Sequence, residues 1–129
     1  MKILIALVLV FTLYACNSSK PEISETLTPT AFADELKTNS EIVLLDVRTP
    51  EEVQAGIIAG AKNINYNAES FAHSLDSLDH SKTYFVYCAA GKRSGKALDL
   101  MKEKGFQHVT SLEGGIKSWT SNGLPVTKP

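Results

Sequence analysis

The chain has 129 residues, 43% of them hydrophobic and 21% charged, which fits one globular domain rather than a two-domain enzyme with its own cofactor domain. The 13 Lys and Arg residues nearly balance the 14 Asp and Glu residues, so the net charge of −1 excludes a strongly basic face for nucleic acid. The two cysteines, Cys16 and Cys88, are too few for a disulfide-rich scaffold or an all-cysteine zinc site.

The first 15 residues have the features of an export signal. Lys2 precedes an apolar run over residues 3–13, which is shorter than the ~20 residues of a permanent membrane-spanning helix. The run leads into the tetrapeptide Leu-Tyr-Ala-Cys that ends at Cys16. This tetrapeptide resembles the lipobox of bacterial lipoproteins, in which the cysteine becomes the first residue and carries diacylglycerol. The alternative is an ordinary secretory signal followed by an incidental cysteine.

We therefore interpret residues 1–15 as a lipoprotein signal peptide, residues 16–27 as a polar tether and residues 28–129 as the folded domain. Lipidation of Cys16 predicts an exported protein that is anchored to a bacterial membrane and faces the periplasm. It also leaves Cys88 as the only thiol, without a partner for an intramolecular disulfide. A lone thiol in an oxidising compartment has to be buried or used.

Apolar periodicity in the domain alternates between strand-like runs and helix-like spacing. Two helices begin at a Thr-Pro pair, at Thr28 and Thr49, which is the pattern of an N-cap followed by Pro at the first helical position. In chain order we expect a helix over 28–38, a strand over 42–45, a short helix from 49 that ends before 56, a short strand over 62–65, a helix over 69–78, a strand over 83–87, a helix that ends near 104, a strand over 108–112 and a last helix that ends at 122–123. This alternation predicts a three-layer α/β/α fold whose mostly parallel sheet presents the carboxyl ends of its strands at one edge.

A cysteine follows the predicted strand 83–87, and the next six residues suit an anion. Cys88 is the candidate nucleophile, and the candidate substrate-binding residues are Ala89, Ala90, Gly91, Lys92, Arg93 and Ser94. Unpaired N–H groups where a helix begins can point at one anion, and the positive end of the helix dipole favours a thiolate over a thiol. Lys92 and Arg93 add positive charge, while Ser94 can cap the helix and donate a hydrogen bond. The pattern predicts a cysteine that is activated without a histidine and whose pKa lies below that of free cysteine.

This segment resembles the active-site loop of single-domain rhodanese-like sulfurtransferases, which has a Cys, four residues, then Arg and Ser or Thr. Further matches follow in the family's order over residues 28–125. They are the Asp-Val-Arg segment and acidic helix over 45–52, the Gly-Ala-x-Asn-Ile segment over 60–64, the Glu-Gly-Gly-Ile segment over 113–116 with Trp119, and Gly-Leu-Pro over 123–125. The resemblance implies the rhodanese-like α/β fold.

The resemblance also implies a persulfide cycle. Cys88 would take a sulfane sulfur from thiosulfate, a polysulfide or a persulfide and pass it to cyanide, a thiol or a protein partner that carries persulfide. The cycle needs no metal and no organic cofactor, and the three histidines have no metal-ligand spacing. Many members that act on thiosulfate have Arg directly after the nucleophile, where this chain has Ala89, and we therefore expect weak use of thiosulfate. Many members also have His where this chain has Ile57.

Three alternatives to this interpretation exist. Cys88 could be a structural core cysteine, although two cations and a glycine beside it contribute nothing to packing. A cysteine phosphatase or arsenate reductase has five residues between Cys and Arg, and this loop has four, which suits a sulfur atom better than phosphate. A non-catalytic interaction module or a sulfur carrier would keep the same fold.

Three further residues are assigned structural roles near the site. Asp46 is expected to end its strand and hold a neighbouring loop, Arg48 to pair with an acid on the following helix, and Glu113 with its glycines to shape the pocket wall.

Overall fold

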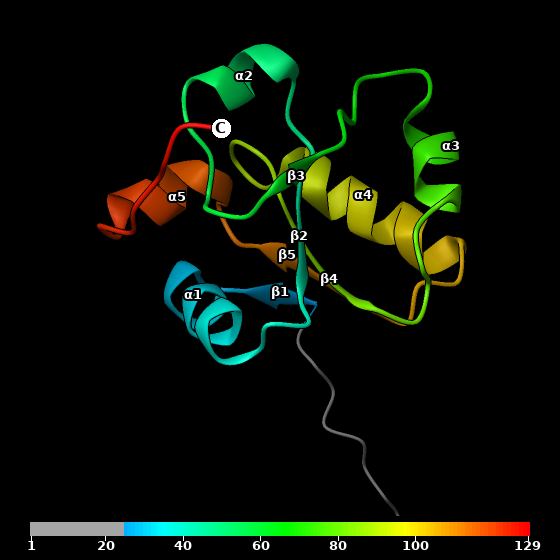
Figure 1. The fold of residues 1–129 in the computed structure, drawn as a ribbon, viewed down its shortest axis with the longest axis horizontal. Coiled ribbons are helices and arrows are strands. Elements are labelled where there is room, and N and C mark those ends of the chain that lie inside the picture. Colours follow the sequence, from blue (N-terminus) through cyan, green and yellow to red (C-terminus); the bar gives the residue numbers. More distant parts are fainter. Residues whose placement is uncertain (1–24) are drawn as a thin grey trace, which may run out of the picture.

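The computed structural model describes residues 25–129, in which five parallel strands form one sheet in the order β1-β5-β4-β2-β3 (Figure 1). The strands are β1 (Thr26–Leu27), β2 (Val43–Asp46), β3 (Lys62–Asn63), β4 (Thr83–Tyr87) and β5 (His108–Leu112). The helices are α1 (Pro29–Thr38), α2 (Pro50–Gln54), α3 (Phe71–Asp76), α4 (Lys92–Glu103) and α5 (Gly115–Ser121).

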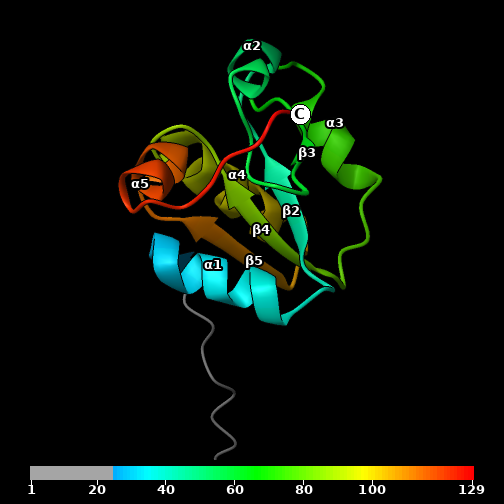
Figure 2. The ribbon, with the colours of Figure 1, turned by 60° about the vertical axis from the view of Figure 1, so that its left-hand side comes forward.

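Two hydrophobic clusters lie on opposite faces of the sheet. Successive residues of β2 point to opposite faces, so Leu44 joins the cluster under α1 and α5, whereas Leu45 joins the cluster under α3 and α4. Trp119 of α5 is buried in the first cluster, as its helical spacing predicts. Figures 1 and 2 show α1 and α4 on opposite sides of the sheet. The predicted three-layer α/β/α fold with a parallel sheet is therefore confirmed.

The helix boundaries follow local chemistry where the sequence carries a clear signal. The Thr28 side chain accepts a hydrogen bond from the Ala31 N–H, and α1 ends at Thr38 as predicted. Thr49 forms a capping box with Glu52, in which each side chain accepts from the other's backbone N–H. Gly105 follows α4 with a φ of +92°, the left-handed conformation expected after a helix.

The amino-terminal edge of the sheet differs from the prediction. Thr26 and Leu27, placed by the sequence in the tether, form β1 beside β5. The Ser111 N–H donates to the Glu25 carbonyl over 2.8 Å and the Glu113 N–H donates to the Leu27 carbonyl over 2.9 Å. Two residues are too few to show an apolar periodicity in the sequence. Thr26 and Leu27 form a strand because they pair with the edge of β5. The signal peptide over 1–15, Cys16 and the tether as far as residue 24 lie outside the described residues.

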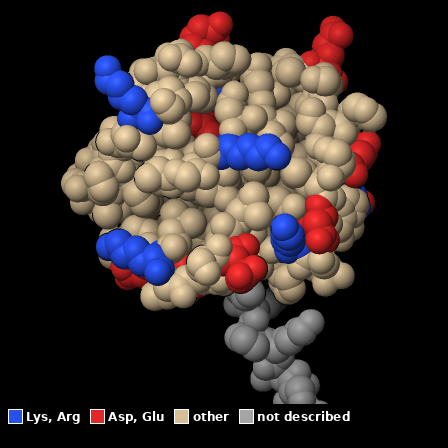
Figure 3. Space-filling view, viewed as in Figure 1, with Lys and Arg blue, Asp and Glu red and all other residues tan. Residues whose placement is uncertain are grey.

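The surface of residues 25–129 carries charges of both signs, which are interspersed on the face drawn in Figure 3. Lys104 Nζ lies 2.6 Å from a carboxylate oxygen of Asp76, which joins α4 to α3. None of the helices in this described range has the length and apolar character needed to cross a membrane.

Candidate active site

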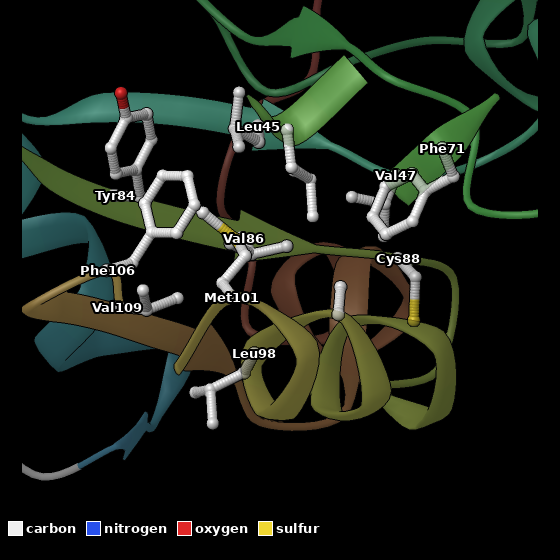
Figure 4. Packing of buried hydrophobic residues seen from close by; sticks show 12 residues of the cluster. Leu45, Val47, Phe71, Tyr84, Val86, Cys88, Leu98, Met101, Phe106 and Val109 are labelled. Atoms are coloured by element: carbon white, nitrogen blue, oxygen red, sulfur yellow. The ribbon is translucent and has the colours of Figure 1, made fainter. Parts of the chain in front are cut away.

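Cys88 lies directly after β4, at the carboxyl edge of the sheet, and its side chain is 1% exposed. Figure 4 shows its sulfur pointing toward α4. The chain turns back at Gly91, whose φ of +98° favours glycine, and α4 begins at Lys92. Gly91 is therefore the N-cap of α4, and the expectation that Ser94 caps this helix is wrong. Ser94 lies three positions after the N-cap, in the first turn of α4.

Hydrogen-bond donors of the loop converge on the Cys88 sulfur. The Gly91 N–H donates to Sγ over 3.1 Å, and the Ser94 hydroxyl oxygen lies 3.5 Å from Sγ. Burial raises the pKa of Cys88, but hydrogen bonds from the Ser94 hydroxyl and from the Ser94, Gly91 and Ala90 N–H groups outweigh burial and leave this pKa below its ordinary value. The direction agrees with the expectation from the sequence, and the dominant source is the set of loop donors.

A second serine, not identified from the sequence, lies behind Ser94. Ser111 on β5 is 4% exposed, and its hydroxyl donates to Ser94 Oγ over 2.9 Å. The Ser94 hydroxyl has one proton, which it gives either to the Gly91 carbonyl, 3.2 Å away, or to the sulfur. A thiolate at Cys88 is the stronger acceptor, so Ser111 supports a hydroxyl that turns to the sulfur when the sulfur is charged. In the sequence, the sign of this role is a polar residue, Ser111, inside the predicted strand 108–112.

The beginning of α5 holds the first residues of the loop. The Ile116 N–H donates to the Cys88 carbonyl over 2.9 Å, and the Lys117 N–H donates to the Ala89 carbonyl over 3.1 Å. Gly115 permits this approach, because a Cβ there would lie 2.5 Å from backbone atoms of Cys88 and Ala89. Among the residues expected to shape the pocket wall, Gly115 lies against the backbone of Cys88 and Ala89, whereas the Glu113 side chain is exposed.

The two loop cations have different surroundings. Arg93 forms a bidentate ion pair with Glu52 of α2, with both N–O distances at 2.8 Å. The hydrogen bond from Arg93 lowers the pKa of Glu52 to about 2, with Thr49 contributing in the same direction and burial opposing. Lys92 and Ala90 are exposed, and Ala89 is half-buried. The sequence predicts that Arg93 adds positive charge to the loop, whereas in the structure Arg93 is paired with Glu52, 41 residues away.

Asp46 and Arg48 form a separate buried ion pair at the end of the neighbouring strand β2. The Asp46 carboxylate accepts from Arg48 Nη2 over 2.7 Å and from the Arg48 backbone N–H over 3.0 Å. Arg48 also donates to the carbonyls of Glu52 and Gly56. The expectation that Arg48 pairs with an acid on the following helix is therefore wrong, because it pairs with Asp46 and reaches that helix only through backbone carbonyls. Asp46 ends its strand and fixes the segment after it, as expected.

One open hollow of about 790 Å³ lies away from the cysteine. It is lined by Lys62, Asn63, Ile64, Asn65, Ala68, Ser70, His73, Ser74, Asp76, Ser77 and Leu78, and none of these belongs to the loop 88–94. Among residues 25–129, no three His, Cys, Asp or Glu side chains are grouped so that they could hold a metal ion.

Comparisons with known proteins agree with this geometry. The family model described as the rhodanese-like domain matches residues 28–122, which confirms the resemblance found in the sequence. MoeZ of Mycobacterium tuberculosis, named a probable adenylyltransferase/sulfurtransferase, is 34% identical over 100 residues. These cover 78% of this chain and 26% of MoeZ, so the chain spans about a quarter of that relative's length.

Two further matches cover most of the other protein. Thiosulfate sulfurtransferase 16, chloroplastic, of Arabidopsis thaliana is 37% identical over 91 residues, which are 63% of this chain and 76% of that protein. The crystal structure of a rhodanese-related protein from Thermoplasma volcanium is 31% identical, with a TM-score of 0.71 over 80% of this chain and 97% of its own. Both the sequence and the backbone are thus similar to proteins of this type.

Proposed function

Because this chain belongs to the rhodanese-like domain family, in which named relatives are sulfurtransferases, we propose that it transfers sulfane sulfur through a persulfide on Cys88. The supporting observation is the convergence of the Ser94 hydroxyl and the Gly91 N–H on Sγ. The Gly91 N–H already donates to the sulfur, and the Ser94 hydroxyl lies within reach of a negative charge on it, so little reorganisation is needed when that charge forms.

The proposed cycle has two displacements. In the first, the Cys88 thiolate attacks the sulfane sulfur of the donor; a new S–S bond forms at Sγ, the donor's S–S bond breaks, and the electron pair leaves with sulfite or a thiolate. In the second, cyanide or a thiol attacks the outer sulfur of the persulfide, and the electron pair returns to Sγ. Charge and electrons balance without an external oxidant or reductant. The loop donors stabilise the anionic Sγ of the free enzyme, which is both the attacking group and the group released in the second displacement.

The donors proposed are thiosulfate, a polysulfide or a low-molecular-weight persulfide, and the acceptor is a small thiophile or a persulfide-carrying protein. Ala89 supports the less charged donors, because a dianion such as thiosulfate gains from a cation directly beside the nucleophile. Inorganic thiosulfate is thus expected to react, but slowly.

We propose in addition that the domain is exported and held at a membrane by lipid on Cys16. The support is the sequence of the first 16 residues, with its charged start, short apolar run and lipobox-like end. Expression of the full chain with Cys16→Ala should move the protein from the membrane fraction to the soluble periplasmic fraction. An unchanged distribution between fractions would contradict the lipid anchor.

The persulfide is tested by mass spectrometry of the purified protein after incubation with thiosulfate or a polysulfide. We expect one added sulfur atom on Cys88, lost again on addition of cyanide with release of thiocyanate. Cys88→Ser is nearly isosteric and should fold but neither bind sulfur nor turn over. Turnover by a folded Cys88→Ser protein would overturn the assignment.

A further inference from the structure

Glu52 connects α2 to the Cys88 loop through both of its carboxylate oxygens. Oε1 accepts from Arg93 Nη2, and Oε2 accepts from Arg93 Nη1 and from the N–H and hydroxyl of Thr49. The capping box therefore holds this carboxylate in place on α2, independently of its contact with Arg93. A carboxylate in the first turn of a helix is further stabilised by the helix dipole. Glu52 is thus a fixed negative charge at the loop, not a mobile surface acid.

This pairing changes what the loop offers to an anionic ligand. Arg93 lies within electrostatic reach of the sulfur, since interaction with Cys88 is among the causes that raise the pKa of Arg93. Both terminal nitrogens of Arg93 are bound to Glu52, so its charge is neutralised and its main fork is occupied. The next residue after the nucleophile is Ala89, and Lys92 is exposed. A donor that approaches Sγ therefore gains less from Arg93 than it would gain from an unpaired guanidinium.

We propose that Glu52 is a specificity-determining residue, which by pairing with Arg93 disfavours dianionic sulfur donors relative to donors with one negative charge fewer. The proposal rests on the sulfurtransferase function proposed above and names the class of donor. Donors that carry sulfane sulfur on a monoanionic or neutral group lose less from the missing cation. The acid acts through Arg93 and not on the sulfur, so it changes the choice of donor and not the chemistry of transfer.

The experiment compares two donors that differ by one charge and react in the same way. Thiosulfate is a dianion that releases sulfite, and methanethiosulfonate is a monoanion that releases methanesulfinate. Glu52→Gln removes the charge and keeps the capping box, because Gln serves at this position as well as Glu. The ratio of kcat/KM for thiosulfate to kcat/KM for methanethiosulfonate should rise by roughly two- to fivefold, the range of an exposed ion pair. The rise should shrink at high salt, because salt screens exposed charges.

Two variants serve as controls. Glu51→Gln removes an identical charge from the same turn of α2, but Glu51 is exposed, so the donor ratio should stay that of the unsubstituted protein. Arg93→Gln changes the charge in the opposite direction and should lower the ratio. An equal effect of Glu51→Gln, or an unchanged ratio in Glu52→Gln, would overturn the proposal.

Failure of this inference is separable from failure of the proposed function. If Glu52→Gln merely loosens the loop, both donors slow down together and the ratio is unchanged, which contradicts specificity by charge. If neither of these donors nor a polysulfide puts sulfur on Cys88 of the unsubstituted protein, the proposed function itself fails. Persulfide formation with an unmoved ratio leaves the function standing and removes only the role of Glu52.

Discussion

The ends of β2 and β4 are neighbours in the sheet, with Asp46 paired in register with Tyr87, yet they treat a buried charge in opposite ways. After β2, the Asp46 carboxylate is matched by the Arg48 guanidinium and backbone N–H. After β4, the Gly91 N–H and the Ser94 hydroxyl lie against the Cys88 sulfur, and no cation among residues 25–129 is bonded to it. In the first arrangement, the two charges are paired and hold the backbone after β2 in place. In the second arrangement, hydrogen bonds stabilise a negative charge on one sulfur atom, which remains able to react.

Tyr87 ends β4 and packs against Arg48. Its hydroxyl accepts from the Ile58 N–H over 3.1 Å, and the Arg48 guanidinium carbon lies 5.6 Å from its ring centroid. Burial raises the pKa of Tyr87 strongly, and the hydrogen bond to Asp46 raises it further, so the phenol stays protonated. Tyr87 therefore stays neutral beside the ion pair, in the cluster on one face of the sheet, while Cys88 belongs to the cluster on the other face. The comparison predicts that substitutions at the β2 end alter stability, while those at the β4 end alter reactivity.

Loss of Arg48 should have the largest effect. Arg48→Met leaves the Asp46 carboxylate buried without its cation, and removing one partner of a buried pair costs about 3–5 kcal/mol of the free energy of unfolding. Urea denaturation followed by circular dichroism measures this loss. A destabilisation below ~1 kcal/mol would show that the β2 end is not the structural half of the comparison.

The matching backbone test of the β4 end is Gly115→Ala. A methyl group there would collide with backbone atoms of Cys88 and Ala89 at 2.5 Å, and overpacking of this kind costs about 1–3 kcal/mol. We expect persulfide formation to fall sharply, since the loop must move away from α5. Gly123→Ala is the control, because Gly123 also has a positive φ of +74° but open space around it. Equal activity of the two variants would mean that α5 does not position the loop.

Deletion of the serine hydroxyls should change reactivity without a comparable loss of stability. A hydrogen bond to a charged group contributes about 1.5–3 kcal/mol, so Ser94→Ala should slow alkylation of Cys88 by iodoacetamide at neutral pH by roughly 10- to 100-fold. Loss of a donor to the thiolate raises the pKa of Cys88, and the rise of the rate with pH therefore moves to higher pH. Ser111→Ala should act in the same direction but less strongly, because it acts through Ser94.

A hydroxyl far from the loop provides the control for these two variants. The Ser74 hydroxyl on α3 donates to the Ser70 carbonyl, and Ser74→Ala should leave the pH profile of alkylation unchanged. An unshifted profile for Ser111→Ala as well would restrict Ser111 to a packing role.

The parts of this molecule that local chemistry specifies were predictable from the sequence. Thr28 and Thr49 mark helix starts because a cap and a proline act within one turn. The apolar run over 83–87 becomes β4 with the predicted bounds, and it delivers Cys88 to the carboxyl edge. The loop between Cys88 and α4 is short and its residues are small, so the backbone has to turn closely around the sulfur. This turn brings the N–H groups of the loop near Sγ.

Contacts between distant segments were not predictable in the same way. Glu52 and Arg93 are 41 residues apart, and Ser94 and Ser111 are 17 residues apart, so their pairing depends on how β4, β5 and α2 meet. Arg48 is a different case: its partner lies only two positions away, but the choice depends on a side-chain direction fixed by burial. The sequence therefore predicts Cys88 as the candidate nucleophile together with its loop, and the structure adds the groups that contact them.

The smallest effect expected from this comparison tests the charge at the mouth of the site. Two unit charges about 4 Å apart interact by about 4 kcal/mol at an effective dielectric of ~20 and by about 1 kcal/mol in bulk water. Ala89 is half-buried and its neighbour Ala90 is exposed, so a cation at position 89 lies near the wet limit. Ala89→Arg should therefore raise kcat/KM for thiosulfate by roughly five- to tenfold, equivalent to about 1–1.4 kcal/mol.

Salt dependence separates this charge effect from a change in loop shape. Exposed charges are screened beyond about 8–10 Å at physiological ionic strength, so the gain from Ala89→Arg should shrink as salt rises, whereas a change of shape would persist. Steady-state kinetics with thiosulfate and with a polysulfide, at low and high salt, measure both. If the unsubstituted protein already prefers thiosulfate, or if Ala89→Arg leaves kcat/KM for thiosulfate unchanged, position 89 does not select the donor. The persulfide on Cys88 would then still stand, because it depends on the donors to Sγ and not on this rim position.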